Sequence, residues 1–249
     1  MKISIVTVSY NSEKTIRDTI LSVLSQTYPD IEYIIVDGTS TDGTLKVIDE
    51  YREKIAQVIS EPDKGIYDAM NKGIRRATGD FVGILNSDDF LATPDIIEGL
   101  AAFLQEHPDL DCSYADVVYV HRDAPEKILR LYSSKNFSPR KVRIGLMIPH
   151  AGFYAKRELF EKFGYYKLDY RVAADFELMA RFMKKGAVLG RYPRTMVKMR
   201  NGGISSNGFF WRVHQNFEIV RACRENGIYT NILLLLLKIP SKLLSYIRR

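Results

Sequence analysis

Short apolar runs alternate with amphipathic segments through the first 110 residues, and this alternation restricts the possible fold more than any other feature. The apolar runs have the length of buried strands and lie at residues 2–8, 32–37, 56–60 and 81–85. Apolar residues with helical spacing follow each run, at residues 12–26, 45–51, 66–74 and 93–108. Strands that alternate with helices form right-handed crossovers. The pattern therefore predicts an α/β fold with a mainly parallel sheet flanked by helices.

The second half of the chain is less regular. Residues 112–120 and 127–133 resemble a pair of strands, and residues 187–200 have an extended pattern. Helical patterns occupy residues 158–164, 172–186 and 209–226. No internal repeat or low-complexity linker separates the two halves.

Composition excludes several classes of protein. The 249 residues contain two cysteines, Cys112 and Cys223, whose separation gives neither a disulfide framework nor a metal-binding spacing. The first residues lack a signal-peptide pattern and no run reaches the ~18 apolar residues of a membrane span, so we expect a cytoplasmic protein. The net charge is +6 without a recognised nucleic-acid motif, so no nucleic-acid partner is expected.

Polar residues follow all four strands of the first half. These residues are Thr7 to Asn11, Asp37 with Gly38, Glu61 to Gly65, and Asn86 to Asp89. One polar strand end is commonly a turn or a helix cap. Ligands of open parallel sheets collect at the carboxyl ends of the strands, so four polar ends indicate a shared binding cleft.

Two adjacent carboxylates, Asp88 and Asp89, end the fourth strand. Such groups repel each other unless a cation or a proton intervenes. Mg²⁺ or Mn²⁺ accepts oxygen ligands and leaves positions open for phosphates, so we expect one of these ions to link the pair to a diphosphate. The alternative is that one carboxylate caps the next helix, although Thr93 and Pro94 already provide a good helix start.

The loop after the first strand contains neither a dinucleotide-binding nor a P-loop glycine pattern. A nicotinamide dehydrogenase and a P-loop enzyme are therefore disfavoured, and a bound nucleotide must be held by side chains and metal. Asp37 is placed to accept a hydrogen bond from an imino N–H of a base such as uracil. The alternative role for Asp37 is that of a turn carboxylate, which Asp42 fits better.

Three segments resemble family 2 glycosyltransferases of the GT-A fold. They read "ISIVTVSYNSEKTIRDTILSVLSQTYPDIEYIIVDGTSTDGT", "GIYDAMNKGIRRATGDFVGILNSDD" and "PHAGFYAKRELFEKFGYYKLDYRVAADFELMARF". The pattern is most similar to bacterial transferases that build O-antigen, colanic-acid-type and other surface polysaccharides. The resemblance implies a GT-A domain over residues 1–227, with a nucleotide-binding half at 1–110 and an acceptor-side half at 111–227.

The resemblance also implies roles for individual residues of the first half. Thr7, Ser9 and Tyr10 would line the nucleotide pocket, Asp37 would bind the base, and Lys64 would lie near the nucleotide or its diphosphate. "NSDD" stands at the position of the family's D-x-D motif, with Asn86 in place of the first aspartate. Asp89 would be the main metal ligand, and Asp88 would contact the metal or the ribose.

The resemblance assigns the catalytic base to the aspartate of a Glu-Asp pair. The pair reads Ala174-Asp175 here, so Asp175 is the candidate base, with Glu177 as a weaker alternative. Asp175 also suits a helix N-terminus on electrostatic grounds alone. His150 would contact the acceptor or a phosphate, or serve a structural role. The Gln-x-x-Arg-Trp motif of processive synthases is absent, which favours addition of a single sugar.

These assignments imply an inverting, metal-dependent transfer of a sugar from a nucleoside diphosphate sugar, with UDP favoured, to a hydroxyl of a lipid-linked glycan. One rival is a sugar-1-phosphate nucleotidyltransferase, which would need a glycine-rich, arginine-containing loop after the first strand. The other rival is a catalytically silent sugar-binding module, which the loss of glutamate at residue 174 supports.

The C-terminal segment 228–249 is both apolar and basic. Five leucines, 233–237, precede Lys238, and Lys242, Arg248 and Arg249 follow without any acidic residue. An amphipathic helical tail of this kind is expected to lie in the interface of an anionic membrane, on the inner face of the cytoplasmic membrane. The alternative is a helix packed on the domain or on a second subunit.

Overall fold

The computed structural model describes residues 1–202 and 208–237, except for the side chains of residues 208–212. Its elements are, in chain order, β1 (Ile3–Ser9), α1 (Ile16–Leu24), β2 (Ile31–Asp37), α2 (Thr44–Asp49), the 3-10 helix η1 (Arg52–Lys54), β3 (Gln57–Ser60), α3 (Ile66–Arg76), β4 (Phe81–Asn86), β5 (Phe90–Leu91), α4 (Ile96–Glu106), β6 (Cys112–His121), β7 (Ala124–Tyr132), the 3-10 helices η2 (Pro139–Ile144) and η3 (His150–Gly152), β8 (Phe153–Lys156), α5 (Arg157–Phe163), α6 (Ala174–Lys184), β9 (Leu189–Arg200), α7 (Gly208–Glu225) and α8 (Ile232–Leu236).

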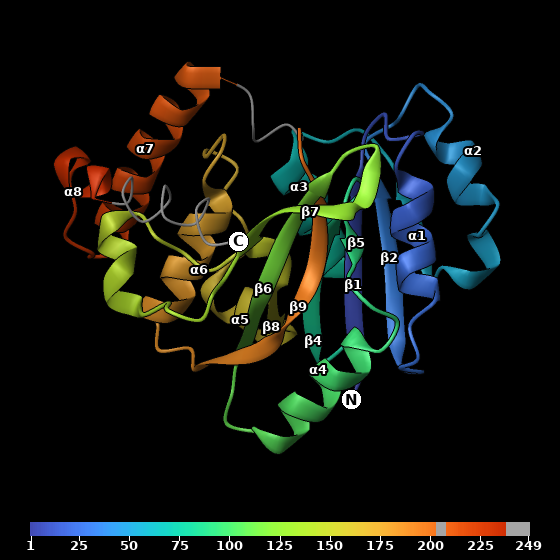
Figure 1. Cartoon of the computed structure of the whole chain (residues 1–249), viewed down its shortest axis with the longest axis horizontal. Helices are drawn as coiled ribbons and strands as arrows, with labels where there is room; N and C mark the ends of the chain where they lie inside the picture. Colours follow the sequence, from blue (N-terminus) through green and yellow to red (C-terminus); the bar gives the residue numbers. More distant parts are fainter. Residues whose placement is uncertain (203–207, 238–249) are drawn as a thin grey trace.

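All of the described strands belong to one sheet with the order β3-β2-β1-β4-β8-β6-β9-β5, and β7 pairs with β6 (Figure 1). Parallel pairs join β1 to β2, β2 to β3, β1 to β4 and β6 to β9. The pairs β4–β8, β6–β8, β6–β7 and β5–β9 are antiparallel. Following these pairings, only β5, β7 and β8 among the described strands run against the others. The predicted mainly parallel α/β sheet is confirmed.

The two faces of the sheet carry separate hydrophobic cores. Ile3, Ile5 and Ile35 face α1, α2 and α4 on one side. Val6 and Ile34, which alternate with them, face α3, α5, α6 and α7 on the other. Alternation follows from the two-residue period of a strand. Burial of these faces supplies the main driving force for folding.

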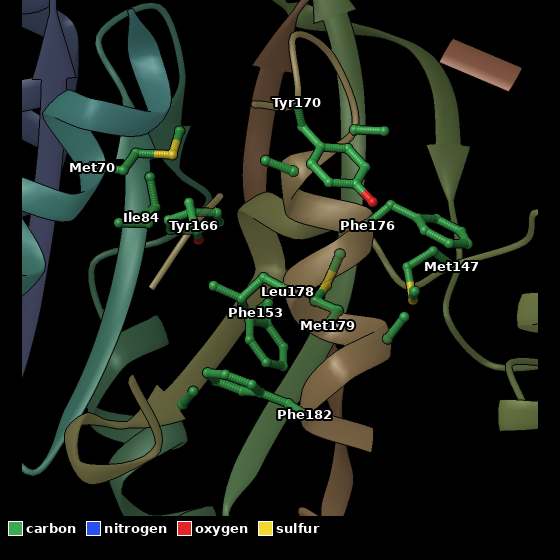
Figure 2. Close-up of a cluster of buried hydrophobic side chains, with 14 of the residues drawn as sticks. Met70, Ile84, Met147, Phe153, Tyr166, Tyr170, Phe176, Leu178, Met179 and Phe182 are labelled. Carbon is green, nitrogen blue, oxygen red and sulfur yellow. The ribbon is translucent and has the colours of Figure 1, made fainter. Parts of the chain in front are cut away.

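The helix α6 lies at the centre of the second core. Figure 2 shows Leu178 of α6 close to Phe153 of β8 and Phe176 of α6 close to Met147, with Met70 of α3 and Ile84 of β4 on the other side of the cluster. The same packing therefore holds α6 against elements from both halves of the chain. It fixes the position of the first turn of α6, where Asp175 lies.

Several boundaries differ from the predicted ones. The helix α1 begins at Ile16 and α4 at Ile96, each a few residues later than the patterns at 12–26 and 93–108 indicate. Strand β8 was not predicted because its four residues are too few to show a period. It inserts between β4 and β6, where the Tyr154 ring lies so close to Gly83 that a Cβ at residue 83 would be 2.3 Å from Tyr154 Cε1.

The helix α8 packs against η2 and α7 near one end of the molecule (Figure 1). Leu235 is buried there, whereas Leu233 is 74% exposed. None of the helices in the described part of the chain is long and apolar enough to cross a membrane. The predicted tail is described only as far as Leu237, and residues 238–249 lie outside the description.

Candidate active site

The carboxyl ends of β1, β2, β3 and β4 meet at one edge of the sheet. Ser9 is in register with Asp37, Asp37 with Ser60, and Val8 with Asn86. The loops that follow are joined as well, because the hydroxyl groups of Ser12 and Ser87 lie 2.7 Å apart. The expected convergence of four polar strand ends at one edge is therefore confirmed.

Asp37 is completely buried at this edge. Its Oδ1 accepts hydrogen bonds from Ser9 Oγ at 3.0 Å and from Ser40 Oγ at 2.5 Å. Its Oδ2 accepts from Ser40 N at 2.8 Å and from Ser60 Oγ at 3.1 Å. The carboxylate thus links the ends of three neighbouring strands, and both of its oxygens are used in doing so.

The other predicted nucleotide contacts lie at different depths around this edge. Thr7 is buried, and its hydroxyl accepts a hydrogen bond from Tyr33 Oη at 3.2 Å. Tyr10 is 64% exposed at the end of β1. Lys64 is exposed, and its backbone N–H donates to Asp68 Oδ2 at 3.0 Å. Tyr10 and Lys64 are therefore accessible to a ligand, whereas the Thr7 side chain is inside the protein.

Asp89 is buried in the turn after β4, and one of its carboxylate oxygens is left without a partner. Its Oδ1 accepts the backbone N–H of Arg200 at 3.2 Å, whereas Oδ2 is buried with no hydrogen bond. Asn86 Oδ1 is likewise buried and unpaired. Arg200 also binds the carbonyl of Asp88 at 2.9 Å and pairs with Asp18, so its positive charge is shared.

The effect of burial on the pKa of Asp88 and Asp89 outweighs the compensation that Arg200 and the Asn86 side chain provide. Burial raises the pKa of Asp89 well above its usual value, and the neighbouring charge of Asp88 adds to the shift. Burial also raises the pKa of Asp88. A hard divalent cation would stabilise both ionised carboxylates and would satisfy Asp89 Oδ2, so the donor set fits Mg²⁺ or Mn²⁺.

The protein supplies only part of such a coordination shell. Within the described residues, no group of three or more His, Cys, Asp or Glu side chains could hold a metal ion. Mg²⁺ commonly uses one or two carboxylates together with substrate phosphates. A site built on Asp88 and Asp89 would therefore be completed by a phosphate-bearing ligand.

Asp175 lies in the first turn of α6, where the helix dipole favours a negative charge. Its Oδ1 accepts the backbone N–H of Phe176 at 2.8 Å. Its second oxygen has no hydrogen-bond partner among the residues that the structure describes. The side chain is half-buried, so one carboxylate oxygen remains available to receive a proton.

Asp175 interacts electrostatically with aromatic and imidazole groups. Burial raises the pKa of Tyr67 and Tyr166, and the negative charge of Asp175 adds to both shifts and opposes the lowering of the pKa of His150. His150 Nε2 and Tyr166 Oη lie 2.7 Å apart. Burial lowers the pKa of His150, and the charge of Asp175 partly opposes this shift. His150 is thus held beside the candidate base as a largely neutral imidazole at pH 7.

The backbone before α6 is held by a carboxylate from α7. Glu218 accepts hydrogen bonds from the N–H groups of Arg171 at 2.7 Å, Val172 at 2.8 Å and Ala173 at 2.8 Å. The residue Ala173, which precedes the helix, has no side chain that could cap it. Glu218, from a distant part of the chain, therefore satisfies the backbone N–H groups just before the helix, where a local capping side chain is missing.

Comparison with known proteins decides the family. The model described as glycosyl transferase family 2 matches residues 4–164 of this chain. The chain belongs to glycosyl transferase family 2. It is 32% identical over 190 residues to a PGL/p-HBAD biosynthesis glycosyltransferase of Mycobacterium bovis, covering 74% of this chain and 72% of the relative. A putative teichuronic acid biosynthesis glycosyltransferase of Bacillus subtilis, TuaG, is 44% identical over 90 residues, or 35% of this chain and 36% of TuaG.

Solved structures show the same fold. The structure of residues 1–349 of S. aureus TarS superposes with a TM-score of 0.67 at 20% identity, covering 89% of this chain and 65% of that one. A mannosyltransferase of Pyrobaculum calidifontis gives a TM-score of 0.67 at 21% identity, covering 90% and 63%. This family 2 glycosyltransferase thus spans slightly less than two-thirds of these solved chains, and their similarity confirms the GT-A fold.

The site of this family 2 glycosyltransferase includes residues that sequence patterns did not reveal. Arg200 reaches Asp88 and Asp89 from the end of β9, more than 100 residues away in sequence, and no motif marks it. Glu218 is similarly distant from the segment that it holds. The structure also corrects one alternative: Glu177 is completely buried and pairs with Arg181 and Lys167, which leaves it unsuitable as a base.

Proposed function

We propose that this chain transfers a sugar from a nucleoside diphosphate sugar to an acceptor hydroxyl with inversion, using Asp175 as general base. The donor nucleotide lies over the ends of β1, β2 and β3, near Ser9, Tyr10, Asp37 and Lys64. Its diphosphate lies at Asp88 and Asp89, which would hold Mg²⁺ or Mn²⁺. When bound, the ion supplies Lewis acidity toward the departing diphosphate.

The unpaired Oδ2 of Asp89 carries this proposal. A buried carboxylate oxygen without a partner is costly, and such cases call for an explanation such as an ion. Its position at the shared edge of four strand ends is where sheets of this type bind ligands. In support, solved structures of TarS contain UDP or UDP-GlcNAc, and that of the Pyrobaculum mannosyltransferase contains GDP-Man and Mn²⁺.

The base assignment is supported by the free oxygen of Asp175 and by its environment. The acceptor hydroxyl loses its proton to Asp175 as it attacks the anomeric carbon, a role that contributes about 10²–10⁴-fold to a rate. The proposed role of His150 is to contact the acceptor or a phosphate. His150 Nε2 is engaged with Tyr166 Oη, whereas Asp175 keeps one carboxylate oxygen without a hydrogen-bond partner among the described residues.

The acceptor is proposed to be a lipid-linked glycan of a surface polysaccharide or glycolipid. The named functions of the mycobacterial and Bacillus relatives support this class of product. The nucleotidyltransferase alternative is disfavoured by the family to which the chain belongs. A silent sugar-binding module remains the rival, and the unpaired oxygens of Asp89 and Asp175 argue for catalysis.

One surface supports an association with anionic lipid on the cytoplasmic side. Residues 127–157 and 226–237 contain no acidic residue, and the first of these segments holds eight of the lysines and arginines. The first of these segments includes η2, against which α8 packs. Arg143 lies over the Tyr229 ring, and its carbonyl accepts a hydrogen bond from Thr230 at 2.5 Å. Exposed basic and apolar side chains are thus adjacent, as in segments that lie on anionic membranes.

Release of nucleoside diphosphate from UDP-, GDP- and dTDP-sugars tests the proposed reaction. We expect slow release from one donor class with Mn²⁺ or Mg²⁺ present and loss of release in excess EDTA. The variant Asp175→Asn should retain donor binding and lose at least about 10²-fold in turnover. The wild type could instead bind a donor but show no metal-dependent turnover, even when candidate lipid-linked acceptors are supplied. That result would support the silent sugar-binding module.

A further inference from the structure

Asp63 follows β3 and reaches across Gly38 toward Tyr10. A Cβ added at residue 38 would lie 2.4 Å from Asp63 Oδ2 and 3.4 Å from Cδ2 of the Tyr10 ring. The lack of a side chain at Gly38 therefore allows the Asp63 carboxylate to rest against the end of β2. It lies there beside the exposed ring of Tyr10, at the edge where the donor nucleotide is proposed to bind.

Local hydrogen bonds fix the orientation of this carboxylate. Asp63 Oδ1 accepts the backbone N–H of Gly65 at 2.8 Å. Lys72 of α3 holds the preceding residues, because its Nζ donates to the carbonyl of Pro62 at 2.6 Å and pairs with Glu61 at 3.0 Å. Asp63 Oδ2, the oxygen above Gly38, has no hydrogen-bond partner within the described residues.

The adjoining loops are held in unusual backbone conformations. Asn11, directly after Tyr10, has a φ of 49°, and Thr39, directly after Gly38, has a φ of 60°. Positive φ is unfavourable for a β-branched residue such as threonine, and strain of this kind concentrates at binding sites. The two loops are joined by a hydrogen bond of 2.9 Å from Thr41 N to Asn11 Oδ1. Tyr10 and Gly38 are thus presented by a preorganised pair of loops.

Asp37 is in a different situation. Each of its two oxygens accepts two hydrogen bonds, from serines of the neighbouring strand ends and loop. Asp37 therefore has no oxygen free to accept a hydrogen bond from a ligand, whereas Asp63 has Oδ2. We propose that Asp63 Oδ2, rather than Asp37, accepts the imino N–H of the donor nucleobase while the base packs on Tyr10. Asp37 then ties the three strands together beneath the site. This inference rests on the proposed nucleotide-sugar donor.

The chemistry of the bases makes the proposal selective. Uracil and thymine carry a donor at N3, and guanine carries donors at N1 and N2, whereas cytosine N3 is an acceptor. A carboxylate oxygen that lacks other partners therefore favours the first three bases over cytosine. Loss of a hydrogen bond to a charged group corresponds to about a 10- to 100-fold loss of affinity.

A methylated nucleotide tests the contact directly. Titration calorimetry in the presence of Mn²⁺ compares UDP with N3-methyl-UDP, which lacks the imino hydrogen, or GDP with N1-methyl-GDP if the wild type prefers guanine. We expect the wild type to bind the methylated ligand about 10- to 100-fold more weakly. In Asp63→Ala the two ligands should bind equally. In Asp63→Asn the amide NH₂ replaces Oδ2, so affinity should shift toward CDP.

Asp42→Ala is the matched control, because Asp42 Oδ1 accepts the N–H of Thr44 at 3.0 Å in a similar turn. This variant should keep the discrimination between the methylated and unmethylated ligands. Discrimination that persists in Asp63→Ala, or equal weakening of both ligands, would overturn the role of Asp63 while leaving the proposed donor class intact. Failure of every nucleoside diphosphate to bind the wild type would overturn the proposed function as well.

Discussion

Tyr67 Oη donates a hydrogen bond of 2.8 Å to the carbonyl oxygen of Val172, three residues before Asp175. Tyr67 lies in the first turn of α3, directly after the β3–α3 loop. It also stacks on Tyr166, with ring centroids 5.7 Å apart. This contact joins the part of the chain proposed to bind the donor to the part that carries the candidate base.

The variant Tyr67→Phe should separate these two functions. We expect turnover to fall about tenfold, since the base loses one support of its backbone, with donor affinity unchanged. The free energy of unfolding should fall by about 0.5–1.5 kcal/mol. Tyr28→Phe is the control, because Tyr28 Oη donates to the carbonyl of Met1 at 2.5 Å outside the site. Equal turnover in the two variants would show that the Tyr67 contact has no part in positioning Asp175.

Glu218→Gln should weaken the support of Asp175 from the other side. A glutamine keeps one acceptor oxygen for three N–H groups, so we expect a loss of about 1–3 kcal/mol in the free energy of unfolding. The kcat should fall while the KM for the donor stays constant. Glu225→Gln changes the same helix, α7, but its carboxylate binds Lys167 and Arg221 instead. A kcat in Glu218→Gln that matches that of Glu225→Gln would contradict the positioning role.

Asp89→Asn should stabilise the metal-free protein while abolishing transfer. The folded protein raises the pKa of Asp89, so between the unfolded value near pH 4 and this raised value the native state binds more protons. Protonated Asp89 therefore stabilises the wild type at low pH, and this stabilisation is lost as the pH rises through that window. The variant avoids the loss and should gain about 1–3 kcal/mol at pH 8, with little difference at pH 4.

Thermal unfolding in EDTA across this pH range measures the difference. One kcal/mol corresponds to about 2–4 °C in Tm for a chain of this size. A wild type that is more stable than Asp89→Asn at pH 8 without metal would show that the protein already compensates the carboxylate.

The double variant Arg140→Gln/Arg143→Gln tests the membrane association. These exposed residues are three apart in the 3-10 helix η2 and so project from the same side. At about 1 kcal/mol per basic residue, binding to vesicles rich in phosphatidylglycerol should weaken about 30-fold. Arg52→Gln/Lys54→Gln is the control, because η1 is an exposed 3-10 helix that follows α2 at the other end of the molecule (Figure 1).

Vesicle sedimentation distinguishes the possible outcomes. If both double variants bind the anionic vesicles equally, the basic residues of η2 do not bind the membrane. The same conclusion follows if the wild type binds neutral phosphatidylcholine vesicles as tightly as anionic ones. Concentration-dependent dimerisation lost in Leu233→Ser would instead assign the exposed leucines of α8 to a subunit contact.

The positions of strand ends could be predicted from the sequence because they depend on local patterns. The apolar run that ends at Leu85 predicts that Asp88 and Asp89 lie at the carboxyl edge of the sheet, and the register brings Ser9 and Asp37 to the same edge. Contacts between distant segments left no local signal. The role of Glu218 depends on how α7 packs on α6, and the free oxygen of Asp63 depends on the missing side chain of Gly38.

The central claim is that Asp89 binds a metal required for the nucleoside diphosphate, whereas Asp175 acts only on the proton. Titration of UDP, or of GDP if guanine is preferred, into the wild type, Asp89→Ala and Asp175→Asn with and without Mn²⁺ tests it most directly. We predict Mn²⁺-dependent binding to the wild type and to Asp175→Asn with similar Kd, and loss of the Mn²⁺-dependent part in Asp89→Ala. Undiminished Mn²⁺-dependent binding to a folded Asp89→Ala would contradict the claim.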